Sequence, residues 1–101
     1  MTRRIKPTRP PATPEVRTIQ DVGAWVRAQR TRLGLRIDDA AALCGVSVPL
    51  FSALEGGTRP VRLDNVLQVI GKLGLAMAVV PQEQVGSILD TLDRDKAAPL
   101  E

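Results

Sequence analysis

Apolar residues recur at helical spacing through most of this 101-residue chain. Ile19, Val22 and Val26 follow one another at intervals of three and four residues, as one face of a helix requires. Thr18 precedes them and can cap a helix, whereas Gly34 follows them and can end one. We therefore expect a first helix between Thr18 and Gly34.

The same pattern predicts three further helices. Gly45 follows a short apolar stretch and is expected to end the second helix, and Ser47 is a good N-cap for the third. Pro49 is tolerated there, because amides in the first helical turn have no helical partner. The expected ranges are about 37–44, 48–55 and 63–73, the last with Leu63, Val66, Leu67 and Ile70 on one face.

A different pattern follows at Leu75–Pro81, which reads LAMAVVP. It is short, ends in two β-branched residues and stops at a proline, which predicts a strand. One strand in an otherwise helical chain has no partner, and an unpaired edge is a liability. Pairing with the same strand of a second copy resolves this; an irregular apolar tail over the core is the alternative. The residues expected in the dimer strand are Leu75, Met77, Val79 and Val80.

The last part of the chain predicts a short amphipathic helix with acidic flanks. Its apolar positions are Val85, Ile88, Leu89 and Leu92. A helix this short is not stable alone, so it either docks on the domain or binds a partner. The chain is thus divided into a basic arm (1–17), a helical domain (18–81) and an acidic tail (82–101).

The arm is rich in proline and arginine. Four prolines within residues 1–17 exclude a helix and remove backbone donors, so we expect an extended arm that is disordered when alone. Residues 1–81 carry 12 Lys and Arg against 6 Asp and Glu, although the net charge of the whole chain is only +3. A basic front half favours an anionic partner such as nucleic acid. Arg3, Arg4 and Lys6 are then candidates for a DNA minor-groove arm, the alternative being a solubilising leader.

The composition argues against an enzyme. The chain has no His and no Tyr, and its one cysteine, Cys44, falls in an apolar pattern typical of a core residue. We find no Gly-rich phosphate loop and no metal-ligand spacing, so no cofactor is expected. The chain also has no signal peptide and no apolar run of membrane-spanning length. We therefore expect a cytoplasmic protein with no membrane partner.

The second and third helices form a candidate helix-turn-helix. Ala41 supplies a small residue where the helices cross, and Gly45 tolerates the positive φ that the turn needs. A plain helical hairpin without a DNA role is the alternative. The positions that must be apolar for both helices to share one core are Ala40, Cys44, Val46, Phe51 and Leu54, and all are.

Residues 33–80 resemble the XRE-type, phage-repressor-like helix-turn-helix domains, and most closely the HipB-like antitoxins. The likeness rests on GVS at 45–47, LEGG at 54–57 and LGLAMAVV at 73–80, and it covers roughly residues 19–81. It implies a mostly α, five-helix-type repressor-like domain with one C-terminal β-strand that pairs across a homodimer. It also implies a repressor that binds an inverted-repeat, double-stranded DNA operator, autoregulates its operon and neutralises a HipA-like kinase toxin.

The resemblance implies that the third helix reads bases, yet this helix has an unusual surface. Its base-reading positions are Val48, Pro49, Ser52 and Ala53, where many relatives have Gln, Arg or Asn. Apolar contacts to thymine methyls discriminate less than bidentate pairs do, so specificity is expected to rely on DNA shape and on arginines elsewhere. The expected contacts to the DNA backbone are Arg36, Ser47, Arg59 and Arg62.

Three hypotheses follow. The first is a dimeric repressor of the HipB-like antitoxin kind. The second is a stand-alone XRE-type regulator without a toxin. The third is a protein-interaction module that binds a kinase-like partner and has little DNA affinity, which the apolar third helix favours.

Overall fold

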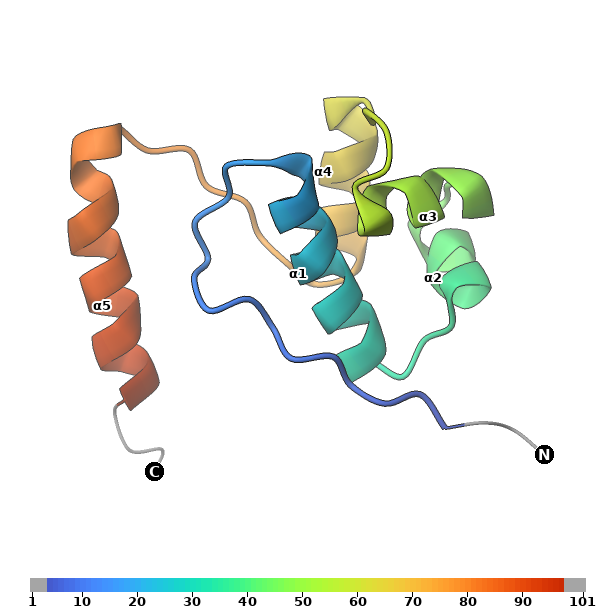
Figure 1. The fold of residues 1–101 in the computed structure, drawn as a ribbon, viewed down its shortest axis with the longest axis horizontal. Coiled ribbons are helices and arrows are strands. Elements are labelled where there is room, and N and C mark those ends of the chain that lie inside the picture. The colour runs from blue at the N-terminus through green and yellow to red at the C-terminus, as the bar shows by residue number, and fades with distance from the viewer. Residues whose placement is uncertain (1–3, 98–101) are drawn as a thin grey trace.

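The computed structural model describes residues 4–97, which form five α-helices and one 3₁₀ turn (Figure 1). Helices α1 to α4 pack together, and α5 stands to one side of them. The four helices expected before residue 75 are confirmed, as is the amphipathic helix of the tail. Their bounds are α1 Ile19–Arg32, α2 Ile37–Cys44, α3 Val48–Gly56, α4 Leu63–Lys72, η1 Gln82–Gln84 and α5 Val85–Ala97.

A capping box starts α1, with Thr18 as the N-cap that the sequence predicted. The hydroxyl of Thr18 accepts a hydrogen bond from the Asp21 amide at 3.1 Å, and the Asp21 carboxylate accepts one from the Thr18 amide at 3.0 Å. The Arg17 amide also donates to this carboxylate, at 2.8 Å. These backbone donors, that of Arg17 first, hold the pKa of Asp21 below its ordinary value of 3.8.

The core joins the first four helices. Gly23 lets α1 approach the end of α3 closely, because a Cβ at this position would lie 2.4 Å from the Leu54 carbonyl oxygen. Leu54 and Phe51 on α3 are fully buried against this core. The largest fully buried side chains are Phe51, Leu54, Leu73, Val26, Val69 and Cys44.

The predicted strand does not form in the single chain. Within residues 4–97 no strand is present, and Leu75–Val80 follow an irregular path between α4 and α5 (Figure 1). Leu75 is tied back to α4, because its amide donates to the Ile70 carbonyl at 2.9 Å, and it packs against the core. Beyond it the segment leaves the core, and Val79 is 95% exposed. A strand needs a neighbouring chain, so pairing across a dimer stays a prediction.

The described part of the N-terminal arm, residues 4–17, contains no helix, as its prolines require. It nevertheless follows a defined path beside α1 (Figure 1). The Thr8 amide donates to the Thr31 hydroxyl at 2.8 Å, and the Trp25 indole donates to the Thr13 carbonyl at 3.2 Å. The composition did not predict these contacts; disorder of the free arm stays a prediction.

None of the individual helices in the described part of the chain is long and apolar enough to cross a membrane. Only α2 and α3 taken together, across their bend, satisfy a length and composition criterion.

Candidate nucleic-acid interface

Helices α2 and α3 have helix-turn-helix geometry. Their axes meet at 108°, within the range of about 90–120° typical of the motif. Gly45 ends α2 with φ +72°, the left-handed conformation predicted for the turn. Ala41 is 1% exposed at the crossing, and its carbonyl accepts from the Val46 amide at 3.0 Å. The small residue and the turn glycine therefore act as the sequence indicated.

The outer surface of α3 is largely apolar, and one predicted base reader is not part of it. Val48 is 44% exposed, and Pro49 and Ser52 are also exposed. Ala53, in contrast, is only 5% exposed, because it faces the core beside Leu54. Its burial removes Ala53 from the set of side chains that can reach a base.

The start of α3 offers few amides to a phosphate. Ser47 uses its hydroxyl as the helix cap, accepting from the Leu50 amide at 3.2 Å. Pro49 has no N–H. Within residues 4–97 the amides of Ser47 and Val48 have no protein acceptor. The helix dipole and these two N–H groups are what the N-terminus presents to an anion.

Two predicted DNA-backbone arginines stand at helix starts. Arg36 is the N-cap residue of α2, and Arg62 is that of α4. Their side chains are 73% and 81% exposed, with Arg36 Nε 3.9 Å from Asp38 Oδ1 and Arg62 Nη2 3.0 Å from Asp64 Oδ2. Such exposed ion pairs contribute little, so both guanidinium groups can turn to a phosphate at small cost.

The third arginine lies against α3 itself. Arg59 Nη2 is 3.5 Å from the Pro49 carbonyl oxygen, so the loop between α3 and α4 folds back towards the first turn of α3. This places a cation beside the exposed residues Val48 and Pro49. The structure thus brings Arg59 next to the first turn of α3, and its contact with the DNA backbone stays a prediction.

The arm residues are placed in part. Arg3 lies outside the described residues, whereas Arg4 and Lys6 are exposed. In Figure 1 the start of the described chain extends past the C-terminal end of α1, away from α5 and towards the side that carries α2. Any DNA contact by these two side chains stays a prediction.

A buried ion pair positions α3 and was missed from the sequence. Arg30 Nε and Nη2 donate to the two Glu55 carboxylate oxygens at 2.7 Å each, and Arg30 Nη1 donates to the Leu35 carbonyl at 2.7 Å. The side chains are only 10% and 8% exposed. Although it is charged, Arg30 does not lie on the solvent-exposed face of α1. Its position four residues after the buried Val26, on the same helical face, was the available signal.

Two glutamines also hold the helix-turn-helix in place and were not predicted. Gln68 on α4 donates to the Cys44 carbonyl at the end of α2, at 2.6 Å. Gln20 on α1 donates to the Gly57 carbonyl at the end of α3, at 3.1 Å. Both satisfy carbonyls that a helix end leaves without a helical partner.

Cys44 is a core residue, as predicted. It is fully buried, and burial raises the pKa of its thiol, which keeps it protonated at neutral pH. In the described part of the chain, no three His, Cys, Asp or Glu side chains gather where they could hold a metal ion.

Comparison with known sequences agrees with this geometry. The sequence profile of a family described as "Helix-turn-helix domain" matches residues 21–98. The chain belongs to this helix-turn-helix family. It is also 34% identical over 65 residues to an uncharacterized HTH-type transcriptional regulator of Sinorhizobium fredii, covering 64% of this chain and 86% of that protein. The helix-turn-helix prediction is thereby confirmed at the level of the family.

Proposed function

We propose that this protein is a DNA-binding transcriptional regulator that inserts α3 into the major groove. The observation that carries the proposal is the arrangement of α2 and α3 at 108°, with Arg59 lying against the exposed first turn of α3. Arg36, Arg59 and Arg62 lie at the start of α2, beside α3 and at the start of α4, and none is buried in the core.

In this proposal α3 and the arginines have different tasks. Val48 and Pro49 contact thymine methyls, and the Ser52 hydroxyl bonds to a base edge. Arg36, Arg59 and Arg62 hold phosphates, while Ser47 and its amide contribute at the helix start. Arg4 and Lys6, with Arg3, enter the minor groove. Most of the affinity is then electrostatic, and specificity relies partly on DNA shape.

The regulator acts as a homodimer on an inverted repeat. Residues 75–80 pair with the same segment of a second copy about a two-fold axis. Met77, Val79 and Val80 supply the exposed apolar surface for this contact, with exposures of 39%, 95% and 38%. Leu75, also predicted in the strand, packs against its own core and anchors the segment.

A finer proposal concerns the partner. The LGLAMAVV stretch resembles that of HipB-like antitoxins, which supports an antitoxin that represses its own operon and holds a HipA-like kinase toxin inactive. The tail residues Val85, Ile88, Leu89 and Leu92 are then the proposed partner-binding face. A kinase-like reading frame beside this gene, whose product co-purifies with the full chain, supports the antitoxin. Its absence favours a stand-alone regulator.

An interaction module with little DNA affinity is the second candidate function. It is favoured by the absence of Arg, Lys, Asn and Gln from residues 47–57, the stretch that contains α3.

The test of DNA binding uses the full chain and two duplexes of equal length, one from the region upstream of its gene and one of shuffled sequence. We expect tighter binding to the upstream duplex, with affinity that falls steeply as salt rises from 50 to 200 mM, because neutralised phosphates release counterions. Equal affinity for both duplexes contradicts the regulator and favours the interaction module.

A further inference from the structure

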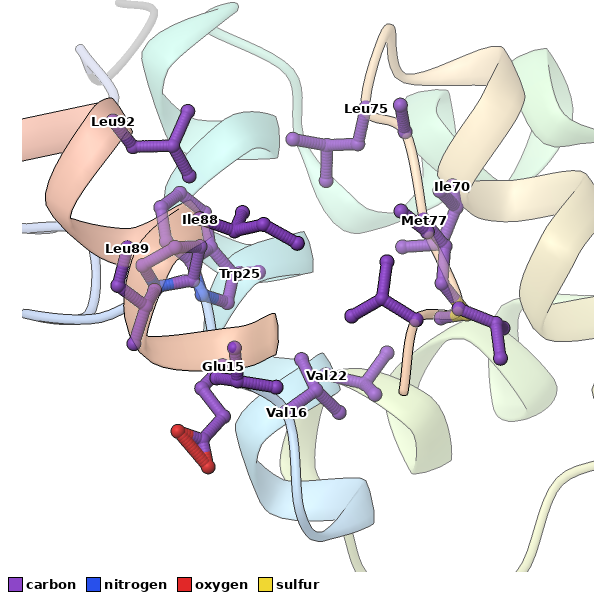
Figure 2. A pocket seen from close by; sticks show the side chains of 16 residues that line it. Glu15, Val16, Val22, Trp25, Ile70, Leu75, Met77, Ile88, Leu89 and Leu92 are labelled. Atoms are coloured by element: carbon purple, nitrogen blue, oxygen red, sulfur yellow. The ribbon is translucent and has the colours of Figure 1, made fainter. Parts of the chain in front are cut away.

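An apolar groove separates α5 from the rest of the molecule. Its volume is about 610 Å³, and side chains from the arm, α1, the 75–80 segment and α5 point into it (Figure 2). Water would have to fill this space in the single chain, about 20 molecules of it against apolar walls, which is unfavourable. Among the lining residues are Val16, Trp25, Ile70, Ile88 and Leu92.

The tail helix does not close the groove itself. Its main helix contact is with η1, which directly precedes it: η1 ends at Gln84 and α5 begins at Val85, so no free linker separates them. Ile88 and Leu92 therefore remain 37% and 46% exposed on the face that α5 turns to the groove. Something else must cover these side chains.

The segment beside the groove has unpaired backbone. Within the described residues, no backbone hydrogen bond involves residues 76–80, although Leu75 is bonded to α4. No charged residue occurs between Lys72 and Glu83. An uncharged, apolar segment with free N–H and C=O groups can enter an apolar groove beside a matching segment without burying a charge. The two other irregular stretches of at least this length, the arm (residues 4–17) and the loop of residues 57–62, both contain arginine and proline.

We propose that the occupant of this groove is residues 75–80 of a second copy, and that α5 of each copy covers the paired segments. This inference rests on the dimer of the proposed function and adds α5 to its interface. It buries Ile88 and Leu92 between the two copies, so it replaces the partner-binding role given to these side chains in the antitoxin proposal. A two-stranded ribbon alone is marginal in water and needs a packed helical layer. Here α1 and α4 supply one layer through Trp25 and Ile70, and α5 supplies the opposite one through Ile88 and Leu92.

The first test adds two charges to the groove face of α5 in the full chain. The Ile88→Asp, Leu92→Asp variant is compared with Ser87→Asp, Thr91→Asp, which adds the same charge at positions of α5 that do not line the groove. We expect the dimer dissociation constant, measured by sedimentation equilibrium, to rise at least about 100-fold in the first variant and by less than about threefold in the second. Circular dichroism melting reports whether α1 to α4 stay folded in both.

A third variant, Val79→Pro, separates this inference from the proposed dimer. If Val79→Pro is monomeric while Ile88→Asp, Leu92→Asp dimerises like the native chain, the strand dimer stands and the role of α5 is refuted. If all variants stay dimeric, the proposed strand dimer is refuted as well.

A cross-linking test keeps the inference falsifiable if the charged variant unfolds. Chains carrying Met77→Cys are mixed with differently tagged chains carrying Leu89→Cys, and Cys44 stays buried and protected. On mild oxidation we expect a disulfide between the two kinds of chain. A chain that carries both substitutions serves as the comparison. If a disulfide forms only within that chain, and not between the two singly substituted chains, α5 covers residues 75–80 of its own chain and the inference is contradicted.

Discussion

The helix-turn-helix region and the C-terminal region of this chain differ in how far their apolar side chains and backbone polar groups find partners within the chain. In residues 18–74 apolar side chains from all four helices form a shared core, although Leu63 and Leu67 stay 64% and 48% exposed, and side chains such as Gln20 and Gln68 bond carbonyls at the helix ends. In residues 76–92, Val79 is 95% exposed and Leu92 is 46% exposed. The first region is packed by contacts within one chain, whereas the second exposes apolar side chains to a degree typical of a binding surface.

Within residues 18–74, we expect the largest change in unfolding free energy from breaking the buried Arg30–Glu55 ion pair. Glu55→Ala leaves Arg30 buried without its carboxylate, so we expect the free energy of unfolding to fall by about 3–5 kcal/mol, measured by urea titration. Asp64→Ala, which breaks the exposed pair with Arg62, is the control and should cost less than about 1 kcal/mol. Equal costs would mean that the Arg30 pair does not hold α3 in place.

A matched pair of valines compares the two regions directly. Val26→Thr puts a hydroxyl into a site that is 0% exposed, and Val79→Thr puts the same group where the side chain is 95% exposed. We expect losses in unfolding free energy of about 1–3 kcal/mol and less than about 0.5 kcal/mol, at a concentration where the chain is monomeric. A comparable loss at Val79 would place this residue in the fold of the single chain and remove the contrast.

The cap of α1 has a smaller expected effect. Thr18→Ala removes the acceptor of the Asp21 amide and should lower the unfolding free energy by about 1 kcal/mol. Thr18→Ser keeps the hydroxyl and serves as the control. A thermal melt in which the two variants coincide would show that the capping box does not stabilise α1.

The smallest effect concerns acid. The pKa of Asp21 is lowered in the folded chain, chiefly by the Arg17 amide, so the stabilisation is complete above the ordinary pKa of 3.8 and is lost as pH falls through the lowered value. Asp21→Asn should therefore flatten the loss of stability below about pH 4, followed by urea titration across this range. If the variant loses unfolding free energy below about pH 4 as steeply as the native chain does, other carboxylates account for that loss.

Short-range sequence patterns, such as helix caps and glycines, predicted most of the fold of residues 18–74. Caps and glycines fix helix ends within a few residues of sequence, so Thr18, Gly45 and Ser47 were interpreted correctly. The Arg30–Glu55 pair joins residues 25 positions apart, and no pattern on either helix identified the partner. Ala53 was misplaced because α3 has only nine residues and is apolar on most sides, so the sequence does not mark its inner face.

The C-terminal region was predicted less well for a different reason. The helical spacing of Val85, Ile88 and Leu89 was enough to predict α5. Residues 75–81 show a sequence preference for a strand, but a strand needs a neighbouring segment to pair with, and none of the described residues 4–97 supplies one, so pairing with a second copy stays a prediction. The order of the arm along α1 also depends on single contacts, such as the Trp25 indole with the Thr13 carbonyl.

The measurement that tests the account most directly compares two alanine variants on a panel of duplexes that differ at single base pairs. Arg59→Ala should weaken binding to every duplex by a similar factor and reduce the slope of log affinity against log salt by about 1, because a phosphate contact is lost. Ser52→Ala should change the order of preference among the duplexes and leave the salt slope as it is. The central claim is that α3 reads bases and that arginines outside α3 hold the DNA backbone. If the two variants have the same effect on affinity, preference and salt slope, this division of roles is wrong.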